Sequence, residues 1–82
     1  MHKVKVLFFA TLREIVGEKA IEMEIPISFT VDKLLNNLIE KYPGLGRVKD
    51  AMIVAINREF AASEKVIPEN AEIALFPPVS GG

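Results

Sequence analysis

The chain has 82 residues, half of them hydrophobic, which is enough for one small domain with a single core. Its ten basic and eleven acidic residues are interspersed and give a formal net charge of −1, which argues against a nucleic-acid surface or an anchor to anionic membranes. With no cysteine, the sequence excludes a thiol nucleophile and a thiolate metal site, and the cytoplasm is the expected location. No apolar run is long enough to span a membrane, and the first residues do not resemble a signal peptide.

The first predicted strand spans residues 3–10, where side chains alternate between two faces. These faces carry Val4, Val6 and Phe8 on one side and Lys3, Lys5, Leu7 and Phe9 on the other. Residues 11–14 have the spacing of a capping box, which predicts a short helical turn that ends at Gly17. The residues available to pack inward from this turn are Leu12, Ile15 and Val16. Residues 19–25 predict a second strand whose glutamates face water.

His2 is the single histidine, and because it stands beside the first residue we expect a mobile, solvated imidazole rather than a ligand or a base. No catalytic triad can be assembled from the sequence, and the glutamates of residues 19–25 lack the further ligands that a metal site needs. We therefore expect no metal and no permanently bound cofactor.

One long helix is predicted over residues 31–42, with Thr30 as its N-cap and Pro43-Gly44 as its end. Its apolar stripe at a spacing of 3.6 residues consists of Val31, Leu34, Leu35, Leu38, Ile39 and Tyr42. A stripe of this kind is typical of a core-facing helix, so we expect it to form half of the core.

The second half of the chain predicts three further strands. A loop over residues 44–51 leads to a strand over 52–57, and Asn57-Arg58 is the expected hairpin corner before a short return strand that begins at Phe60. A polar connection follows over residues 63–70. The last strand, residues 71–76, places Ile73 and Leu75 on one face and Ala74 and Phe76 on the other.

This order of elements predicts an α+β domain in which the main helix packs across one face of a mixed sheet. The opposite face of the sheet would carry Leu7, Phe9, Ala55, Ala74 and Phe76. Large apolar side chains on an uncovered face predict a docking surface for a protein partner.

The ending of the chain predicts a projecting tail. Pro77 and Pro78 cannot continue a sheet, so we divide the chain into a folded domain over residues 1–76 and a C-terminal tail over 77–82. The tail consists of Pro77, Pro78, Val79, Ser80, Gly81 and Gly82. Because glycine has no Cβ, a narrow channel of another protein could enclose the end, and we interpret the carboxylate of Gly82 as the reactive group.

Four stretches carry a resemblance to a known family: residues 4–14, Thr30-Val31, residues 54–57 and above all the Pro-Pro-Val-Ser-Gly-Gly ending. Together they resemble the small, sulfur-carrying subunit of molybdopterin synthase, over nearly the whole chain. The resemblance implies a ubiquitin-like β-grasp fold. Residues 68–71 depart from the family, which often has an acidic, glycine-containing turn there.

The resemblance also implies a chemistry. An E1-like activating enzyme would use ATP to adenylate Gly82, and a sulfur donor protein would then convert the adenylate to a thiocarboxylate. Within the large, catalytic subunit of molybdopterin synthase, that sulfur would pass to the pterin precursor of the molybdenum or tungsten cofactor. The chain itself would be the non-catalytic sulfur donor, and Phe9, Phe60 and Phe76, with Leu7 beside them, would contact the partner.

Three alternatives remain open at this point. A thiamine-pathway sulfur carrier would share the fold and the thiocarboxylate, although the Pro-Pro-Val-Ser ending favours the molybdenum branch. A ubiquitin-like protein modifier would be conjugated to lysines through Gly82. A plain interaction domain would make no use of its tail.

Overall fold

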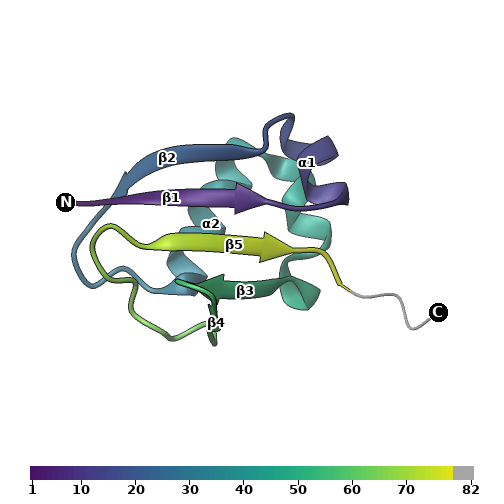
Figure 1. Ribbon diagram of the computed structural model, residues 1–82. Helices are drawn as coiled ribbons and strands as arrows, with labels where there is room; N and C mark the ends of the chain where they lie inside the picture. The colour runs from purple at the N-terminus through teal and green to yellow at the C-terminus, as the bar shows by residue number, and fades with distance from the viewer. Residues whose placement is uncertain (79–82) are drawn as a thin grey trace.

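The computed structural model describes residues 1–78 and shows a five-stranded sheet with one long helix across it (Figure 1). The strands are β1 (His2–Phe8), β2 (Ala20–Ile25), β3 (Ile53–Ile56), β4 (Glu59–Phe60) and β5 (Glu72–Phe76). The helices are α1 (Thr11–Val16) and α2 (Val31–Lys41), followed by the 3₁₀ helices η1 (Pro43–Arg47) and η2 (Lys49–Ala51). No helix among the described residues is both long and apolar enough to cross a membrane.

The strand order in the sheet is β2-β1-β5-β3-β4. The central pair, β1 and β5, runs parallel, whereas β1–β2, β3–β5 and β3–β4 are antiparallel. The first and last strands of the described chain therefore lie side by side in the middle of the sheet (Figure 1). The predicted α+β class and mixed sheet are confirmed.

The core lies between α2 and the inner face of the sheet. Four residues of the predicted helical stripe are buried, while Ile39 and Tyr42 are partly buried against the core. On the sheet side, the fully buried residues include Val4, Val6, Phe8, Ile25, Ile73 and Leu75. The predicted cap of α2 is also present, because Thr30 Oγ1 accepts a hydrogen bond from the backbone N–H of Lys33 at 3.3 Å.

The start of α1 differs from the prediction. Its N-cap is Ala10, at φ 51°, and no side chain caps the helix, so the capping box predicted over residues 11–14 is wrong. The chain reverses through backbone hydrogen bonds instead, with the N–H of Arg13 donating to the carbonyl of Ala10 at 3.0 Å. The end of the helix is as predicted, because Gly17 adopts a left-handed conformation at φ 83°. Ile15, which we expected to pack inward, is 40% exposed.

Two connections contain more structure than their composition predicted. The expected loop over residues 44–51 consists mostly of the two 3₁₀ helices, and Leu45 is fully buried beneath them. In the connection over residues 63–70, Ile67 is fully buried, and its N–H donates to the carbonyl of Phe29 at 2.9 Å. In both places a fully buried apolar side chain anchors the connection to the core, and Val48 packs beside it in the first.

The hairpin corner at Asn57-Arg58 is present as predicted, whereas the start of the chain differs from the prediction. Asn57 and Arg58 have φ values of 50° and 73°, as a tight hairpin turn with two left-handed residues requires, so the predicted corner is confirmed. His2 is not part of a mobile end, because it opens β1 in register with Ile25 and is half-buried.

Candidate docking face and tail exit

The face of the sheet that α2 leaves uncovered carries an apolar cluster, which we call the apolar outer face. It consists of Leu7, Phe9, Ile53, Ala55, Phe60, Ala74 and Phe76. Strand register explains how these residues meet, because side chains directly opposite in neighbouring strands share a face. Ala74 is paired with Leu7 on one side and with Ala55 on the other. Segments far apart in the sequence thus form one continuous surface.

Phe9 and Phe76 form the centre of this face. Their rings stack at a centroid distance of 4.6 Å and an interplanar angle of 14°. The backbone N–H of Phe9 donates to the carbonyl of Leu75 at 3.1 Å, which extends the pairing of β1 with β5 by one residue and brings the two rings together. Both phenylalanines are only half-buried.

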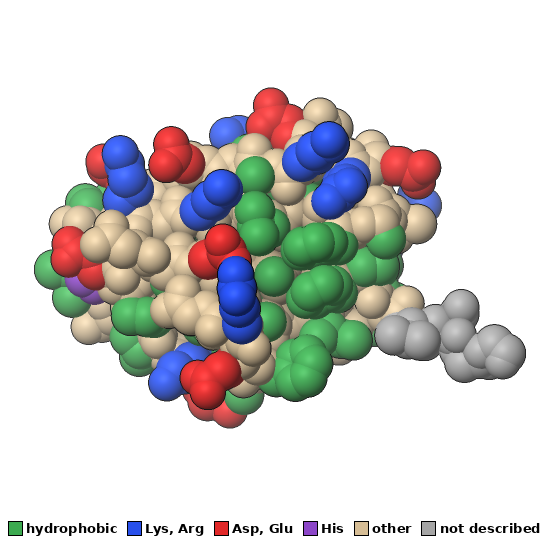
Figure 2. Space-filling model, viewed as in Figure 1, with side chains coloured by type: hydrophobic (Ala, Val, Ile, Leu, Met, Phe, Trp, Pro, Cys, Tyr) green, Lys and Arg blue, Asp and Glu red, His purple; other side chains and the backbone are tan. Residues whose placement is uncertain are grey.

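Among residues 1–78, Phe60 is the most exposed of the large hydrophobic residues, at 85%. Phe60 is the second residue of β4 after the Asn57-Arg58 turn, and it lies opposite Ala55 of β3. The small side chains of Ala55 and Ala74 lie opposite each other on the neighbouring strands β3 and β5. In Figure 2 the hydrophobic side chains gather toward the end of β5, with charged side chains around them. The residues predicted for partner contact, Leu7, Phe9, Phe60 and Phe76, all belong to this face, and their role in binding stays a prediction.

The other end of the same sheet surface is charged. Lys5 lies between Glu22 on β2 and Glu72 on β5, and Lys3 lies opposite Glu24. Opposite charges in neighbouring strands attract each other, so this alternation suits a surface in contact with water. Along β5 the outer surface therefore changes from charged at Glu72 to aromatic at Phe76.

The chain leaves the sheet at the aromatic end. β5 ends at Phe76, and the next residues, Pro77 and Pro78, belong to no strand, the first half-buried and the second exposed. Both residues follow the end of β5 in Figure 1, and the division into a domain over residues 1–76 and a tail over 77–82 stays a prediction. The remaining predicted tail residues, Val79, Ser80, Gly81 and Gly82, lie outside the described residues.

Arg13 is a member of this site that the sequence analysis missed. Its Nε–H donates to the carbonyl of Phe8 at 2.7 Å, and its Cζ lies 5.5 Å from the centroid of the Phe9 ring. That distance is within the range of a cation–π interaction. The signal was a spacing of four residues between Phe9 and Arg13, but this spacing brings the two together only because the chain reverses at Ala10.

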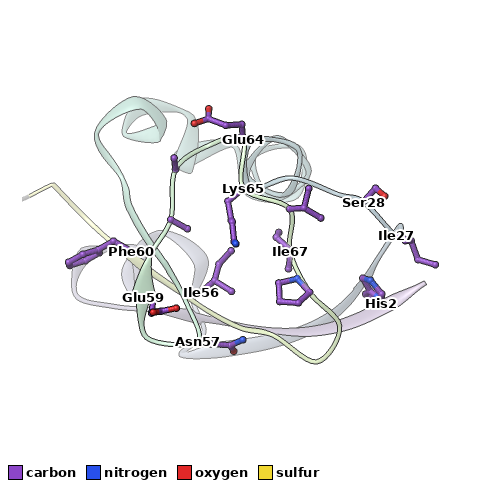
Figure 3. A pocket seen from close by; sticks show the side chains of 14 residues that line it. His2, Ile27, Ser28, Ile56, Asn57, Glu59, Phe60, Glu64, Lys65 and Ile67 are labelled. Atoms are coloured by element: carbon purple, nitrogen blue, oxygen red, sulfur yellow. The ribbon is translucent and has the colours of Figure 1, made fainter.

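A separate groove of about 740 Å³ lies at the β4 edge of the sheet (Figure 3). Its lining includes His2, Ile27, Asn57, Lys65, Ile67 and Phe60. The Phe60 ring points away from Lys65 and Ile67 in this view, so it contributes to the rim of the groove rather than to its interior. Phe60 is the one residue that the groove shares with the apolar outer face, and the end of β5 does not line the groove.

Comparison with known sequences shows which family the chain resembles. The model of the ThiS family matches residues 6–82. The chain is 34% identical over 80 residues to the molybdopterin synthase sulfur carrier subunit of Arabidopsis thaliana, covering 98% of this chain and 83% of the relative. It is 37% identical over 82 residues to the subunit of the same name from Drosophila melanogaster, covering 96% and 90% of the two chains.

Solved structures agree with the fold. The crystal structure of small archaeal modifier protein 1, SAMP1, from Haloferax volcanii has a TM-score of 0.85 at 33% identity, over 98% of this chain and 99% of that chain. The ubiquitin of Caldiarchaeum subterraneum has a TM-score of 0.65 at 13% identity, over 99% of this chain and 98% of that chain, which shows the fold alone.

The same fold occurs in a complex of subunits 1 and 2 of the molybdopterin-converting factor from Helicobacter pylori, with a TM-score of 0.67 at 21% identity over 98% of this chain and 99% of that one. The ubiquitin-like β-grasp fold implied by the sequence is therefore confirmed. Because the family model matches nearly all of the chain, and relatives above 30% identity span almost its full length, the chain belongs to the ThiS family.

Proposed function

We propose that this protein is a sulfur carrier for the biosynthesis of the molybdenum or tungsten cofactor. The observation that carries the proposal is the combination of relatives named molybdopterin synthase sulfur carrier subunit with an aromatic face at the point where the chain leaves the sheet. The carried sulfur would form a thiocarboxylate on Gly82. The chain would act as a non-catalytic subunit, in the cytoplasm, and would donate that sulfur to a pterin precursor.

The chemistry explains why an activating enzyme is needed. A carboxylate resists nucleophiles because it is anionic and has no good leaving group, so an E1-like adenylyltransferase would first join it to AMP from ATP, releasing pyrophosphate. Sulfide-level sulfur released from a donor protein would then attack the carbonyl carbon, form the C–S bond of the thiocarboxylate and break the C–O bond to AMP, which leaves. ATP would be a substrate of the activating enzyme, not a cofactor of this chain. Since the chain has no cysteine, its terminus is the group available to carry the sulfur.

The apolar outer face would dock the chain on its partners, the activating enzyme and the large subunit of molybdopterin synthase. Half-buried and exposed aromatic residues are the usual anchors of protein interfaces. Pro77 and Pro78, directly beyond Phe76, are the first residues of the predicted tail. They restrict its backbone next to this face, which would lower the entropy lost when the end enters an active site.

Intact mass spectrometry tests the proposal. Incubation of the full chain with its activating enzyme, ATP and a sulfur source should replace one oxygen of the terminus by one sulfur, and the product should support pterin sulfuration by the large subunit. A Gly82→Ala variant, or a chain extended by one residue, should stay uncharged while its fold is unchanged. Charging of either variant at the rate of the native chain, or no adenylate from the native chain, would contradict the proposal.

A second candidate function is protein modification, which the likeness to SAMP1 supports. Activation of Gly82 would be shared, but the acceptor would be a lysine of another protein. Immunoblots of lysate from the native host separate the two functions. A ladder of larger adducts that disappears in the Gly82→Ala strain indicates a modifier, whereas a single free band indicates a dedicated sulfur carrier.

A further inference from the structure

The side chain of Arg13 connects the backbone of β1 with the aromatic centre of the apolar outer face. Its Nε–H is fixed on the carbonyl of Phe8, and the plane of the guanidinium is thereby held near the ring of Phe9. Phe9 in turn stacks on Phe76, the last residue of β5. Arg13 thus contacts Phe9, and Phe9 contacts Phe76, which directly precedes the predicted tail.

The backbone at Ala10 is strained, and the strained conformation places Arg13 beside Phe9. Ala10 has φ 51° and ψ −130°, a conformation that alanine rarely adopts and that costs roughly 1–3 kcal/mol. The resulting reversal is what returns α1 over the end of β1 and brings Arg13 to Phe9. Backbone strain of this kind is common where a structure holds a functional group in place.

Docking would change the surroundings of this arginine. A guanidinium carries N–H donors on each of its nitrogens, and the hydrogen bonds among residues 1–78 account only for the one on Nε. A partner that covers the Phe9 ring must also remove water from the guanidinium 5.5 Å from its centroid. A charge that loses water without gaining a counter-charge is strongly unfavourable, so the partner needs an acceptor there. A carboxylate fits best, because it matches the two terminal nitrogens of arginine in a paired geometry.

We propose that Arg13 is a positioning and specificity-determining residue of the apolar outer face: it orients Phe9 against Phe76 and pairs with an acidic side chain of the protein partner. This inference rests on the proposed function, because it concerns the face through which the sulfur carrier docks. The partner surface that fits is an apolar pocket with an Asp or Glu at its rim on the side of α1.

The test measures binding of the full chain to the purified large subunit of its own molybdopterin synthase by calorimetry, at low and at high salt. Arg13→Gln should weaken binding roughly tenfold, and Arg13→Lys, which keeps the charge without the planar fork, should lie between the two. Added salt should weaken binding of the native chain more than binding of Arg13→Gln. The matched control is Arg47→Gln, since Arg47 is an exposed arginine at the end of η1 with no contact to this face, and its affinity should stay within about twofold of native.

Proton NMR of the free proteins tests the positioning step separately. The aromatic resonances of Phe9 and Phe76 should shift in Arg13→Gln and stay in place in Arg47→Gln, while the amide spectrum remains that of a folded domain. Equal affinity and equal salt dependence of Arg13→Gln and the native chain would overturn the inference, as would equal losses in Arg13→Gln and Arg47→Gln. Such a result would leave the proposed function standing, because the native chain would still bind, whereas a native chain that fails to bind the large subunit would overturn both.

Discussion

Phe8 and Phe9 are neighbours in the sequence, yet they serve opposite faces of the sheet. Phe8 is fully buried under α2 and meets Tyr42 edge-to-face at 6.2 Å, whereas Phe9 is half-buried and stacks on Phe76. The inner face is closed by a helix of its own chain, and the outer face has no such cover among the described residues. The same alternation therefore builds a core on one side and, on the other, the apolar surface that we propose for a protein partner. The hydrophobicity of a residue does not by itself tell whether it stabilises the core or is available to a partner. The face of the strand on which the residue lies distinguishes the two.

The largest expected effect breaks the inner face. Phe8→Ala should lower the free energy of unfolding by about 3–5 kcal/mol, because it removes a fully buried ring and leaves a cavity. That is a large part of the stability of a small domain. Phe9→Ala is the matched control and should cost only about 1–2 kcal/mol, from partial burial and the lost stacking. Urea unfolding followed by circular dichroism measures both, and equal losses would contradict the division between the faces.

A smaller effect is expected on the outer face, and in affinity rather than stability. Phe60→Ala should leave the free energy of unfolding within about 0.5 kcal/mol of native, because the ring is 85% exposed. It should weaken binding to the large subunit by about 2 kcal/mol, as expected for an aromatic anchor. Val66→Ala, at 50% exposure and outside this face, is the control and should bind normally. Calorimetric titration distinguishes the two, and normal binding by Phe60→Ala would remove this residue from the interface.

Helix α2, which covers the inner face, can also be destabilised at its N-terminus. Thr30→Ala removes the hydroxyl that accepts the N–H of Lys33 at the start of α2, and should cost about 1 kcal/mol. Thr30→Ser keeps that acceptor and should lie close to the native chain. Thermal denaturation of the three proteins measures the difference, while their affinity for the large subunit should be the same. A loss of affinity in Thr30→Ala at a temperature where it is folded would contradict independence of the two faces.

The smallest effect concerns the charged end of the outer face. Lys5→Glu places three acidic side chains in one row across the sheet, with Glu22 and Glu72 on either side, and should lower the free energy of unfolding by about 0.5 kcal/mol. Lys5→Arg keeps the charge and should be neutral. Salt in the unfolding buffer should reduce the difference between the two variants, since it screens charges at the surface. A difference that is independent of salt would point to packing instead.

Local patterns were sufficient for most of the elements that form these faces. Alternation correctly assigned the two sides of β1 and β5, and the cap at Thr30 and the turn at Asn57 follow from side-chain chemistry close in sequence. The resemblance to a family supplied the β-grasp arrangement and placed Phe60 with Phe9 and Phe76. The strand faces, the cap and the turn depend on a few neighbouring residues, whereas the family resemblance depends on the sequence as a whole.

The features that were missed depend on tertiary contacts. Ile53 joins the apolar outer face only through its register with Phe76. Ile67 is buried because its connection pairs with Phe29 at the edge of the core. Arg13 reaches Phe9 through the reversal at Ala10. The backbone there has a conformation that favours glycine, and because the residue is an alanine, the sequence did not indicate a reversal. Residues 11–14 matched a capping box, but this reversal supplied the helix start instead.

The pairing of β1 with β5 has one further consequence. Leu7, Ala55, Phe60 and Phe76 come together only when strands from opposite ends of the sequence have found one another, so no short stretch of the polypeptide displays the whole surface. If the activating enzyme of the proposed function binds this surface, it would bind only folded molecules, and unfolded molecules would not consume ATP. A synthetic peptide with the last residues alone should be a poor substrate, however faithful its sequence.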